Sequence, residues 1–195
     1  NTDPLIGAGG HCVYNPEPLA DIVDFFALGD GAEVVTEITN VLHSFKSLNG
    51  TPESRSEILR ELSKVEGVYV PSMYEASYNQ NGCQTLEPIY DDVPKLIEKR
   101  TIVDLGDWPY PKEQLVPITE VVHDRLNVEV FRGCTRGCRF CQAGMITRPV
   151  RERPDDQVRT MVQSGLKRTG YDEVALTSLS TADYSGIKEV VEETV

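Results

Sequence analysis

The sequence lacks any run of about 18–20 apolar residues, the length that a membrane-crossing helix requires. It also lacks a leader in which a charged start precedes an apolar stretch, so we expect neither export nor a membrane partner. The chain has few positively charged residues: 19 Lys and Arg stand against 31 Asp and Glu, so the net charge is −12. A chain this acidic is not expected to bind nucleic acid nonspecifically over its whole surface.

Cysteine is scarce as well, and it is unevenly distributed. Three of the five cysteines lie within eight positions, Cys134 to Cys141, and no fourth lies within reach. Such close neighbours rarely reach disulfide geometry, which disfavours an exported protein. Clustered thiols in a reducing compartment more often bind metal, so we expect a cytoplasmic protein. Cys12 and Cys83 have no cysteine nearby and are expected to be buried or incidental thiols.

The length of 195 residues accommodates one large domain or two small ones. The chain begins at Asn1 without a methionine and ends at Val195 inside a segment that we expect to be helical. We therefore expect it to be an internal piece of a longer protein.

The first zone of the chain, residues 1–67, alternates strand and helix signals. "PLIGAGG" predicts a strand that runs into a glycine turn, and "DFFALGDG" predicts a short buried strand. Between them, Asn15 is placed to cap a helix that starts at Pro16. Apolar residues then recur at helical spacing from Val34 to Phe45, and a further helix is opened by Thr51 and Pro52. This alternation is typical of an open α/β layer, of which the zone would be the C-terminal half.

Two further zones follow. Residues 68–126 are expected to form a connector with short strands around an Asn81-Gly82 turn and a proline-rich segment. In residues 127–195, "NVEVFRG" and "DEVALTSLS" predict strands, and each is followed by a loop and a helix. The first of these helices is expected at residues 155–169, with Gly170 ending it. Repeated strand–loop–helix units indicate a parallel barrel or sheet, in which the loops after the strands carry the chemistry.

The loop "FRGCTRGCRFCQAG" is the strongest functional signal in the sequence. A structural zinc site usually takes four cysteine or histidine ligands, but only Cys134, Cys138 and Cys141 are available in this neighbourhood. Three cysteines can instead hold a [4Fe–4S] cluster and leave one iron open to another ligand. Small residues such as Gly144 would let the backbone wrap the cluster. Zinc binding, completed by a ligand from another molecule, is the alternative.

The spacing Cys134-x3-Cys138-x-Phe140-Cys141 after a strand resembles the signature of radical S-adenosylmethionine (radical SAM) enzymes. The resemblance implies that the three cysteines ligate three irons and that S-adenosylmethionine chelates the fourth. It also implies reductive cleavage of S-adenosylmethionine to a 5′-deoxyadenosyl radical, with an electron donor such as flavodoxin or ferredoxin as a partner. Phe140 and Gly144 would lie at the cofactor, with Phe140 near its adenine.

Other cofactor contacts are implied less directly. Many members of the family hold the methionine amino group with a Gly-Gly-Glu loop after the second strand, where this chain has "TSLSTAD". Ser178 and Ser180 could take that role, or they could be turn and cap residues. Among the arginines of "ITRPVRERP", Arg151 is expected near the cofactor carboxylate or an anionic substrate. A solvated loop is the alternative for these arginines.

"GAGGHCVYNPEPLADIVDFFALGDGAE" resembles the end of the cobalamin-binding-like domain that precedes many radical SAM domains. The matching features are Gly9-Gly10, Pro16-Glu17 and the turn from Gly29 to Glu33. The resemblance makes cobalamin possible as a cofactor of the parent protein, but the histidine that ligates cobalt in that family lies upstream of the glycine pair, in sequence that is absent here, so this chain alone does not decide it. A domain kept for architecture alone is the alternative.

Together these observations predict an α/β protein: the C-terminal half of a cobalamin-binding-like domain, followed by the first βα units of a partial (β/α) radical SAM barrel. The full-length protein would be an iron–sulfur enzyme acting on an unknown substrate, and this piece would have weak or no turnover. Residues 131–170 hold nine Arg and Lys against three Asp and Glu, which permits RNA as a substrate without demanding it. The competing hypothesis is a zinc-binding or redox-thiol interaction module without catalysis.

Overall fold

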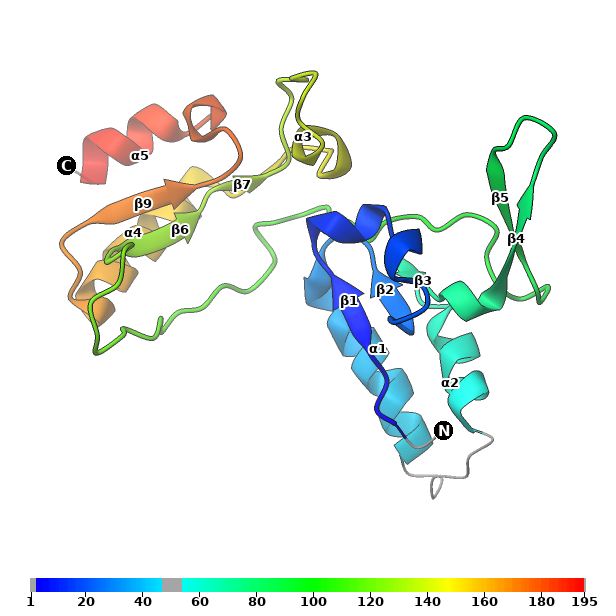
Figure 1. The fold of residues 1–195 in the computed structure, drawn as a ribbon. Helices are drawn as coiled ribbons and strands as arrows, with labels where there is room; N and C mark the ends of the chain where they lie inside the picture. The colour runs from blue at the N-terminus through cyan, green and yellow to red at the C-terminus, as the bar shows by residue number, and fades with distance from the viewer. Residues whose placement is uncertain (1–2, 47–53, 195) are drawn as a thin grey trace. The chain divides into compact units, whose positions relative to one another are not determined.

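A computed structural model of the chain describes residues 3–46 and 54–194 (Figure 1). It divides into two compact units, Asn1–Thr101 and Ile102–Val195. The division falls inside residues 68–126, which the sequence predicts to be a connector, so the boundaries at 67 and 126 stay predictions. In the described part of the chain, no helix combines the length and the apolar character needed to cross a membrane.

The first unit is centred on a three-stranded sheet of order β1-β2-β3. β1 (Gly7–Gly9) pairs in parallel with β2 (Phe25–Ala27), and β2 pairs antiparallel with β3 (Val68–Tyr69). Successive side chains of a strand point to opposite faces. Phe25 therefore packs into the core that contains the helices, whereas Phe26 stacks on Tyr69 in a second cluster. Both strands predicted in residues 1–30 are confirmed.

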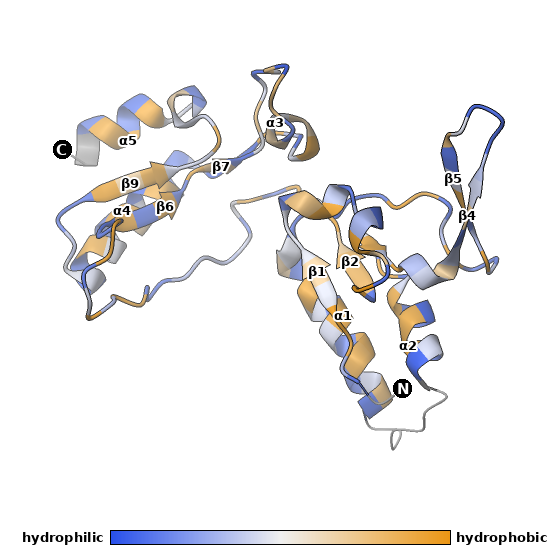
Figure 2. Ribbon diagram, in the orientation of Figure 1, coloured by the Kyte–Doolittle hydropathy of each residue, from blue (hydrophilic) through white to orange (hydrophobic). Residues whose placement is uncertain are grey.

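Helices α1 (Gly31–Lys46) and α2 (Ser54–Leu62) bury their apolar sides against this sheet. Figure 2 shows the alternation of apolar and polar residues along α1 that such one-sided burial requires. The helix predicted from Val34 to Phe45 is confirmed, as is the one carrying Leu59 and Leu62. Its predicted opening at Thr51 and Pro52 lies outside the described residues.

The prediction of a helix that starts at Pro16 is wrong. Only single 3-10 turns form, η1 (His11–Tyr14) and η2 (Glu17–Leu19), and Asn15 ends the first instead of capping the second. The chain has to return to the sheet within a few residues, because the backbone N–H groups of Asp24 and Phe25 both donate to the carbonyl of Ile6. Strand pairing therefore takes the residues that a longer helix would need.

A hairpin of β4 (Tyr74–Tyr78) and β5 (Gln84–Pro88) follows the 3-10 turn η3 (Pro71–Met73). Its loop confirms the turn predicted at Asn81-Gly82, with Gly82 at φ +75°. The Asn79 side chain accepts hydrogen bonds from the N–H groups of Asn81 and Cys83 and so closes the loop. Cys83 and Cys12 were expected to be buried or incidental thiols; both are exposed, so only the expectation of burial is wrong.

The second unit contains the parallel pair β6 (Leu126–Glu129) and β9 (Val174–Thr177), linked through α4 (Asp155–Thr169). α4 and α5 (Ile187–Thr194) cover this pair, and both helices alternate apolar and polar residues (Figure 2). Gly170 ends α4 in the left-handed conformation at φ 76°, as predicted. The βα unit predicted for this region is therefore confirmed.

The segment between β6 and α4 holds structure that the sequence pattern does not predict. The strand expected through Phe131 is interrupted at Val130, whose N–H donates to Thr177 of β9. The chain then forms β7 (Phe131–Arg132), which pairs antiparallel with β8 (Arg151–Glu152). Between β7 and β8 lies the cysteine loop, residues 133–150, which includes the one-turn helix α3 (Ala143–Ile146). A two-stranded ladder thus clamps both ends of the cysteine loop.

Candidate functional site

Gly133 brings the two ends of the cysteine loop into contact. Its φ is +91°, and a Cβ at this position would lie 2.6 Å from the carbonyl oxygen of Pro149 and 2.9 Å from Cα of Val150. Only glycine tolerates this combination of a left-handed backbone and a close backbone neighbour. The loop therefore starts and ends at one place, directly beyond the β7–β8 ladder.

Two of the three thiols lie around a single glycine. A Cβ on Gly144 would lie 3.7 Å from Sγ of Cys141 and 3.8 Å from Cβ of Cys134. The N–H of Gly144 donates to the Cys141 sulfur at 3.3 Å, and the N–H of Arg136 points to the Cys134 sulfur at 3.5 Å. Backbone donors aimed at cysteine sulfurs are what an iron–sulfur site uses to stabilise its negative charge.

Cys138 and Phe140 lie on the exposed side of the loop. Cys138 is exposed, although its carbonyl accepts a hydrogen bond from the N–H of Cys141 at 3.0 Å, and the Phe140 ring is 91% exposed. Within residues 3–46 and 54–194, no three histidine, cysteine, aspartate or glutamate side chains already converge as a metal-ligand set. The donor chemistry and the glycine cradle fit an iron–sulfur cluster, and the three thiols would have to converge to hold it.

The arginines that follow the cysteines take different positions. The Arg148 Nε–H points to the carbonyls of Gly144 at 3.2 Å and Cys134 at 3.4 Å, so Arg148 braces the cysteine loop from its C-terminal end. Arg151 is only 7% exposed and donates to the carbonyls of Pro149, Thr147 and Ile102. This geometry gives Arg151 a packing role, and the contact predicted between Arg151 and a cofactor stays untested.

Arg153 is buried more deeply. It donates to the carbonyls of Leu105 at 2.6 Å and Trp108 at 3.2 Å, and its Nε has no hydrogen-bond partner. Burial lowers the pKa of Arg153, an effect that nearby Glu129 partly opposes. Arg153 thus lies in the core of the second unit, against the segment that contains Leu105 and Trp108.

The loop after β9 carries the serines that were expected to contact a cofactor. The Ser178 hydroxyl lies 2.9 Å from the Thr181 hydroxyl and accepts from the N–H of Ser180, which precedes the 3-10 turn η4 (Thr181–Asp183). Ser180 donates to Asp183 at 2.6 Å. Both serines therefore form hydrogen bonds within the turn, and the cofactor contact predicted for them stays a prediction.

Sequence reasoning missed two charged residues that join this loop to the cysteine loop. The Arg136 guanidinium forms a two-pronged ion pair with Asp183, in which Nε lies 2.6 Å from Oδ2. The hydrogen bond from Arg136, with a second from Ser180, lowers the pKa of Asp183 below its usual range. An arginine between two motif cysteines and an acid in the facing loop were signals in the sequence, but their pairing is a property of the fold.

Comparison with known proteins agrees with these features. Residues 1–71 match the family described as "Radical SAM proteins, N-terminal", and residues 128–195 match the "Radical SAM superfamily". The chain is 30% identical over 193 residues to the uncharacterized protein MJ0966 of Methanocaldococcus jannaschii. That match covers 97% of this chain and 35% of the relative's length.

The chain thus belongs to the radical SAM superfamily, whose members are iron–sulfur proteins that use S-adenosylmethionine. The match to "Radical SAM proteins, N-terminal" ends at residue 71, and the superfamily match begins at residue 128, within β6, just ahead of the cysteine loop. The chain spans about a third of the length of the relative named above, so the reaction of a whole protein belongs among the proposals.

Proposed function

We propose that the protein holds a [4Fe–4S] cluster through the thiolates of Cys134, Cys138 and Cys141 and starts radical chemistry on a substrate. The supporting observation is the cysteine loop, whose ends are clamped by β7 and β8 and whose Gly144 lies beside two of the thiols. When bound, such a cluster supplies the electron, received from a donor such as flavodoxin or ferredoxin, that cleaves S-adenosylmethionine.

The backbone of the cysteine loop would supply hydrogen bonds to the sulfur ligands of the cluster. The N–H groups of Arg136 and Gly144 donate toward the sulfurs of Cys134 and Cys141, as the hydrogen-bond donors around a metal site do toward its ligands. The missing side chain at Gly144 leaves open the space beside the Cys141 sulfur and Cβ of Cys134. These contacts depend on the backbone, so they would persist when side chains around the loop are exchanged.

Two side chains would meet S-adenosylmethionine. The exposed ring of Phe140, directly before Cys141, offers an apolar face for the adenine. Arg148 lines an open pocket of about 530 Å3 together with Thr135, Pro149 and Val150. A guanidinium in such a place pairs well with a carboxylate, so we assign to Arg148 the anion contact that the sequence suggested for Arg151.

The basic residues around the cysteine loop favour packing over RNA binding. Four of the arginines between 131 and 170 face carboxylates: Arg132 with Glu129, Arg136 with Asp183, Arg159 with Asp155 and Arg168 with Glu113. Two more, Arg151 and Arg153, are buried. Most arginines of this region are thus paired with carboxylates of the same unit or buried in it. We therefore do not propose RNA as the substrate class.

For the N-terminal unit we propose an architectural role. Its Gly29 turn is filled by its own chain: Asp30 N–H donates to the Arg100 carbonyl, Arg100 N–H donates to Leu28, and Leu28 N–H donates to Gly67. The backbone N–H groups of Leu28, Asp30 and Arg100 already donate within the chain, so these three groups are not available to a ligand. Titration of the protein with cobalamin, followed by the visible spectrum, is expected to show no binding, and saturable binding would overturn this proposal.

The cluster proposal is tested by anaerobic reconstitution with iron and sulfide. We expect about four irons per chain, and a reduced cluster whose electron paramagnetic resonance (EPR) signal shifts when S-adenosylmethionine is added. The triple variant Cys134→Ala, Cys138→Ala, Cys141→Ala is expected to lose the iron. The double variant Cys12→Ala, Cys83→Ala removes two exposed thiols outside the loop and serves as the matched control, which should retain it.

Two results would contradict the proposal. Stoichiometric zinc in a colourless protein, with no cluster formed under these conditions, would favour the zinc-binding interaction module. Iron uptake that survives in the triple variant would show that the cysteine loop is not the site.

A further inference from the structure

The cysteine loop and the loop after β9 are joined by one side-chain pair. Arg136, between Cys134 and Cys138, reaches Asp183 of η4 with both a 2.6 Å contact from Nε and a shorter one from the second nitrogen. Asp183 also accepts from Ser180 of its own loop at 2.6 Å, so the carboxylate is held in place from both sides. A two-pronged arginine–carboxylate pair fixes orientation as well as distance.

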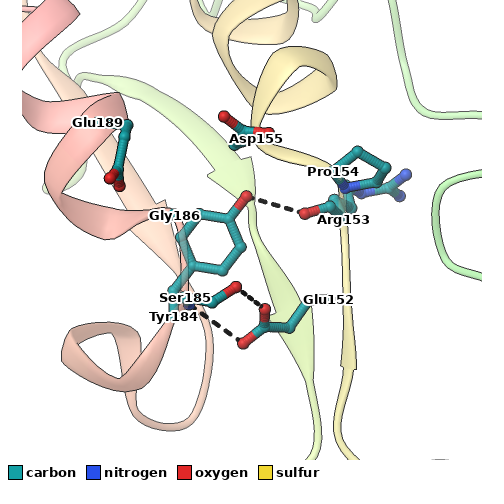
Figure 3. A pocket seen from close by; sticks show the side chains of 8 residues that line it. All are labelled: Glu152, Arg153, Pro154, Asp155, Tyr184, Ser185, Gly186 and Glu189. Carbon is teal, nitrogen blue, oxygen red and sulfur yellow. Dashed lines mark hydrogen bonds between the residues drawn. The ribbon is translucent and has the colours of Figure 1, made fainter.

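The loop after β9 is held independently at its other end. Figure 3 shows Ser185 against Glu152 of β8, where the Ser185 hydroxyl and N–H both donate to the carboxylate. In the same view the Tyr184 hydroxyl donates to the Arg153 carbonyl at 2.8 Å. The Tyr184 side chain is 2% exposed and stacks on Phe131. Burial of this ring, and not the ion pair, therefore provides the packing that folds the loop.

The ion pair and the contacts of Tyr184 and Ser185 contribute differently to the loop after β9. The Arg136–Asp183 pair is partly exposed, with side-chain exposures of 60% and 29%, and exposed ion pairs contribute little to stability. Its distinctive feature is position, because it joins a residue between two thiols to the turn that contains Ser178 and Ser180. Removing it should leave the fold intact and free the turn to move relative to the thiols.

We propose that Arg136 and Asp183 are positioning residues, which hold the 178–183 turn against the cysteine loop so that S-adenosylmethionine meets both loops in a fixed arrangement. The assignment of the cofactor rests on the proposed function above, whereas the fixing of the turn does not. A binding site built from two loops gains affinity when both are preorganised, because less ordering has to occur on binding.

The test compares Arg136→Gln with Arg139→Gln in the protein. Arg139 is also an exposed arginine between two motif cysteines, and it serves as the matched control. In cluster-free protein, we expect amide hydrogen exchange at residues 178–183 to be faster in Arg136→Gln and unchanged in Arg139→Gln. The melting temperatures of both variants should stay close to that of the unchanged protein.

In reconstituted protein, the affinity for S-adenosylmethionine is read from the shift of the reduced EPR signal. We expect roughly tenfold weaker binding in Arg136→Gln and in Asp183→Asn, and no greater loss in the double variant, because both changes remove one interaction. Iron content should be unchanged in all of them.

The outcomes separate the two proposals. If the unchanged protein binds no cluster, the proposed function fails, and hydrogen exchange alone decides whether Arg136 fixes the turn. If exchange at 178–183 is the same in Arg136→Gln and Arg139→Gln, the positioning role is overturned. Losses of affinity that add in the double variant would likewise overturn it, since the residues would then act separately.

Discussion

Two glycines, Gly29 in the turn after β2 and Gly144 in the cysteine loop after β7, differ in what they face. In the N-terminal unit, a Cβ on Gly29 would lie 2.0 Å from the Arg100 carbonyl oxygen, so the space is filled by the protein's own backbone. In the second unit, Gly144 faces the thiols of the cysteine loop at ordinary contact distance. In the sequence, the turn at Gly29 resembles part of a cobalamin-binding-like domain, and Gly144 belongs to the loop predicted to hold a cluster. The comparison teaches that glycines permit a close approach without specifying what approaches.

The N-terminal turn is reinforced by charge. Arg100 donates to Glu33 at 2.9 Å and to Glu37 at 2.5 Å, and it also reaches Glu66 at 3.3 Å. Glu33 is the acid of the Gly-Asp-Gly-x-Glu pattern that suggested a cofactor domain. Its observed partner is an arginine of the chain, which accounts for the acid without a ligand.

The largest effect is expected from Gly29→Ala. At φ +100° and with a backbone oxygen 2.0 Å from the new Cβ, the chain must either strain or release residues 99–101. We expect a loss of about 3 kcal/mol or more in the free energy of unfolding of the N-terminal unit. Urea unfolding followed by circular dichroism measures it. An unchanged transition would show that Arg100 does not occupy this turn in solution.

Gly133→Ala is expected to act next most strongly, but on the cysteine loop. The new Cβ would lie 2.6 Å from the Pro149 carbonyl and force the two loop ends apart. We expect a stability loss of about 1–3 kcal/mol and less than half of the normal iron uptake, measured after reconstitution. Gly170→Ala is the matched control, since φ is +76° there but no atom lies within 4 Å of the new Cβ. Equal iron loss in both variants would point to backbone strain alone.

Gly144→Ala should have a smaller effect, confined to the cluster. Its Cβ would make ordinary contacts at 3.7 and 3.8 Å with Cys141 and Cys134, so the cluster-free fold should be unchanged within about 0.5 kcal/mol. A methyl group beside the Cys141 sulfur and Cβ of Cys134 should slow cluster assembly severalfold, as followed by absorbance during reconstitution. Unchanged assembly would mean that the cluster does not approach Gly144.

The contrast between the turns also explains how far the sequence could predict the structure. Local signals were sufficient for the elements with strong periodicity or clear punctuation: α1, α4 with Gly170 at its end, and the Asn81-Gly82 hairpin are all as predicted. These features depend on residues that are near one another in the chain. The cysteine spacing likewise identified the family, because three thiols at fixed intervals are a local pattern.

What the sequence did not predict depends on contacts between distant residues. Where a helix was expected after Pro16, only a 3-10 turn forms, because the chain returns at Asp24 and Phe25 to pair with Ile6. The strand β8 forms only because β7 lies beside it, 19 residues away along the chain. The Arg136–Asp183 pair spans 47 residues. In each case the partner decides the outcome, and no short window of sequence contains both partners.

The smallest expected effect concerns charge on the segment that leads to Arg100. Asp92 receives hydrogen bonds from Arg60 and an ion pair from Lys64, and these partners lower its pKa to about 2. A lowered carboxyl pKa contributes stability that is complete above the ordinary value near 4 and is lost as the pH falls toward 2. The contribution is small because all three groups are exposed to solvent.

The matching experiment compares the unchanged protein with Asp92→Asn by thermal unfolding between pH 6 and pH 2. We expect a slightly lower melting temperature in the variant at pH 6 and a difference that shrinks toward zero as the pH approaches 2. Glu87→Gln, which removes an ion pair with Lys95 at a more exposed position, is the control and should show little difference at any pH. A constant difference for Asp92→Asn across this range would mean that the side chain stabilises the segment by shape and not by charge.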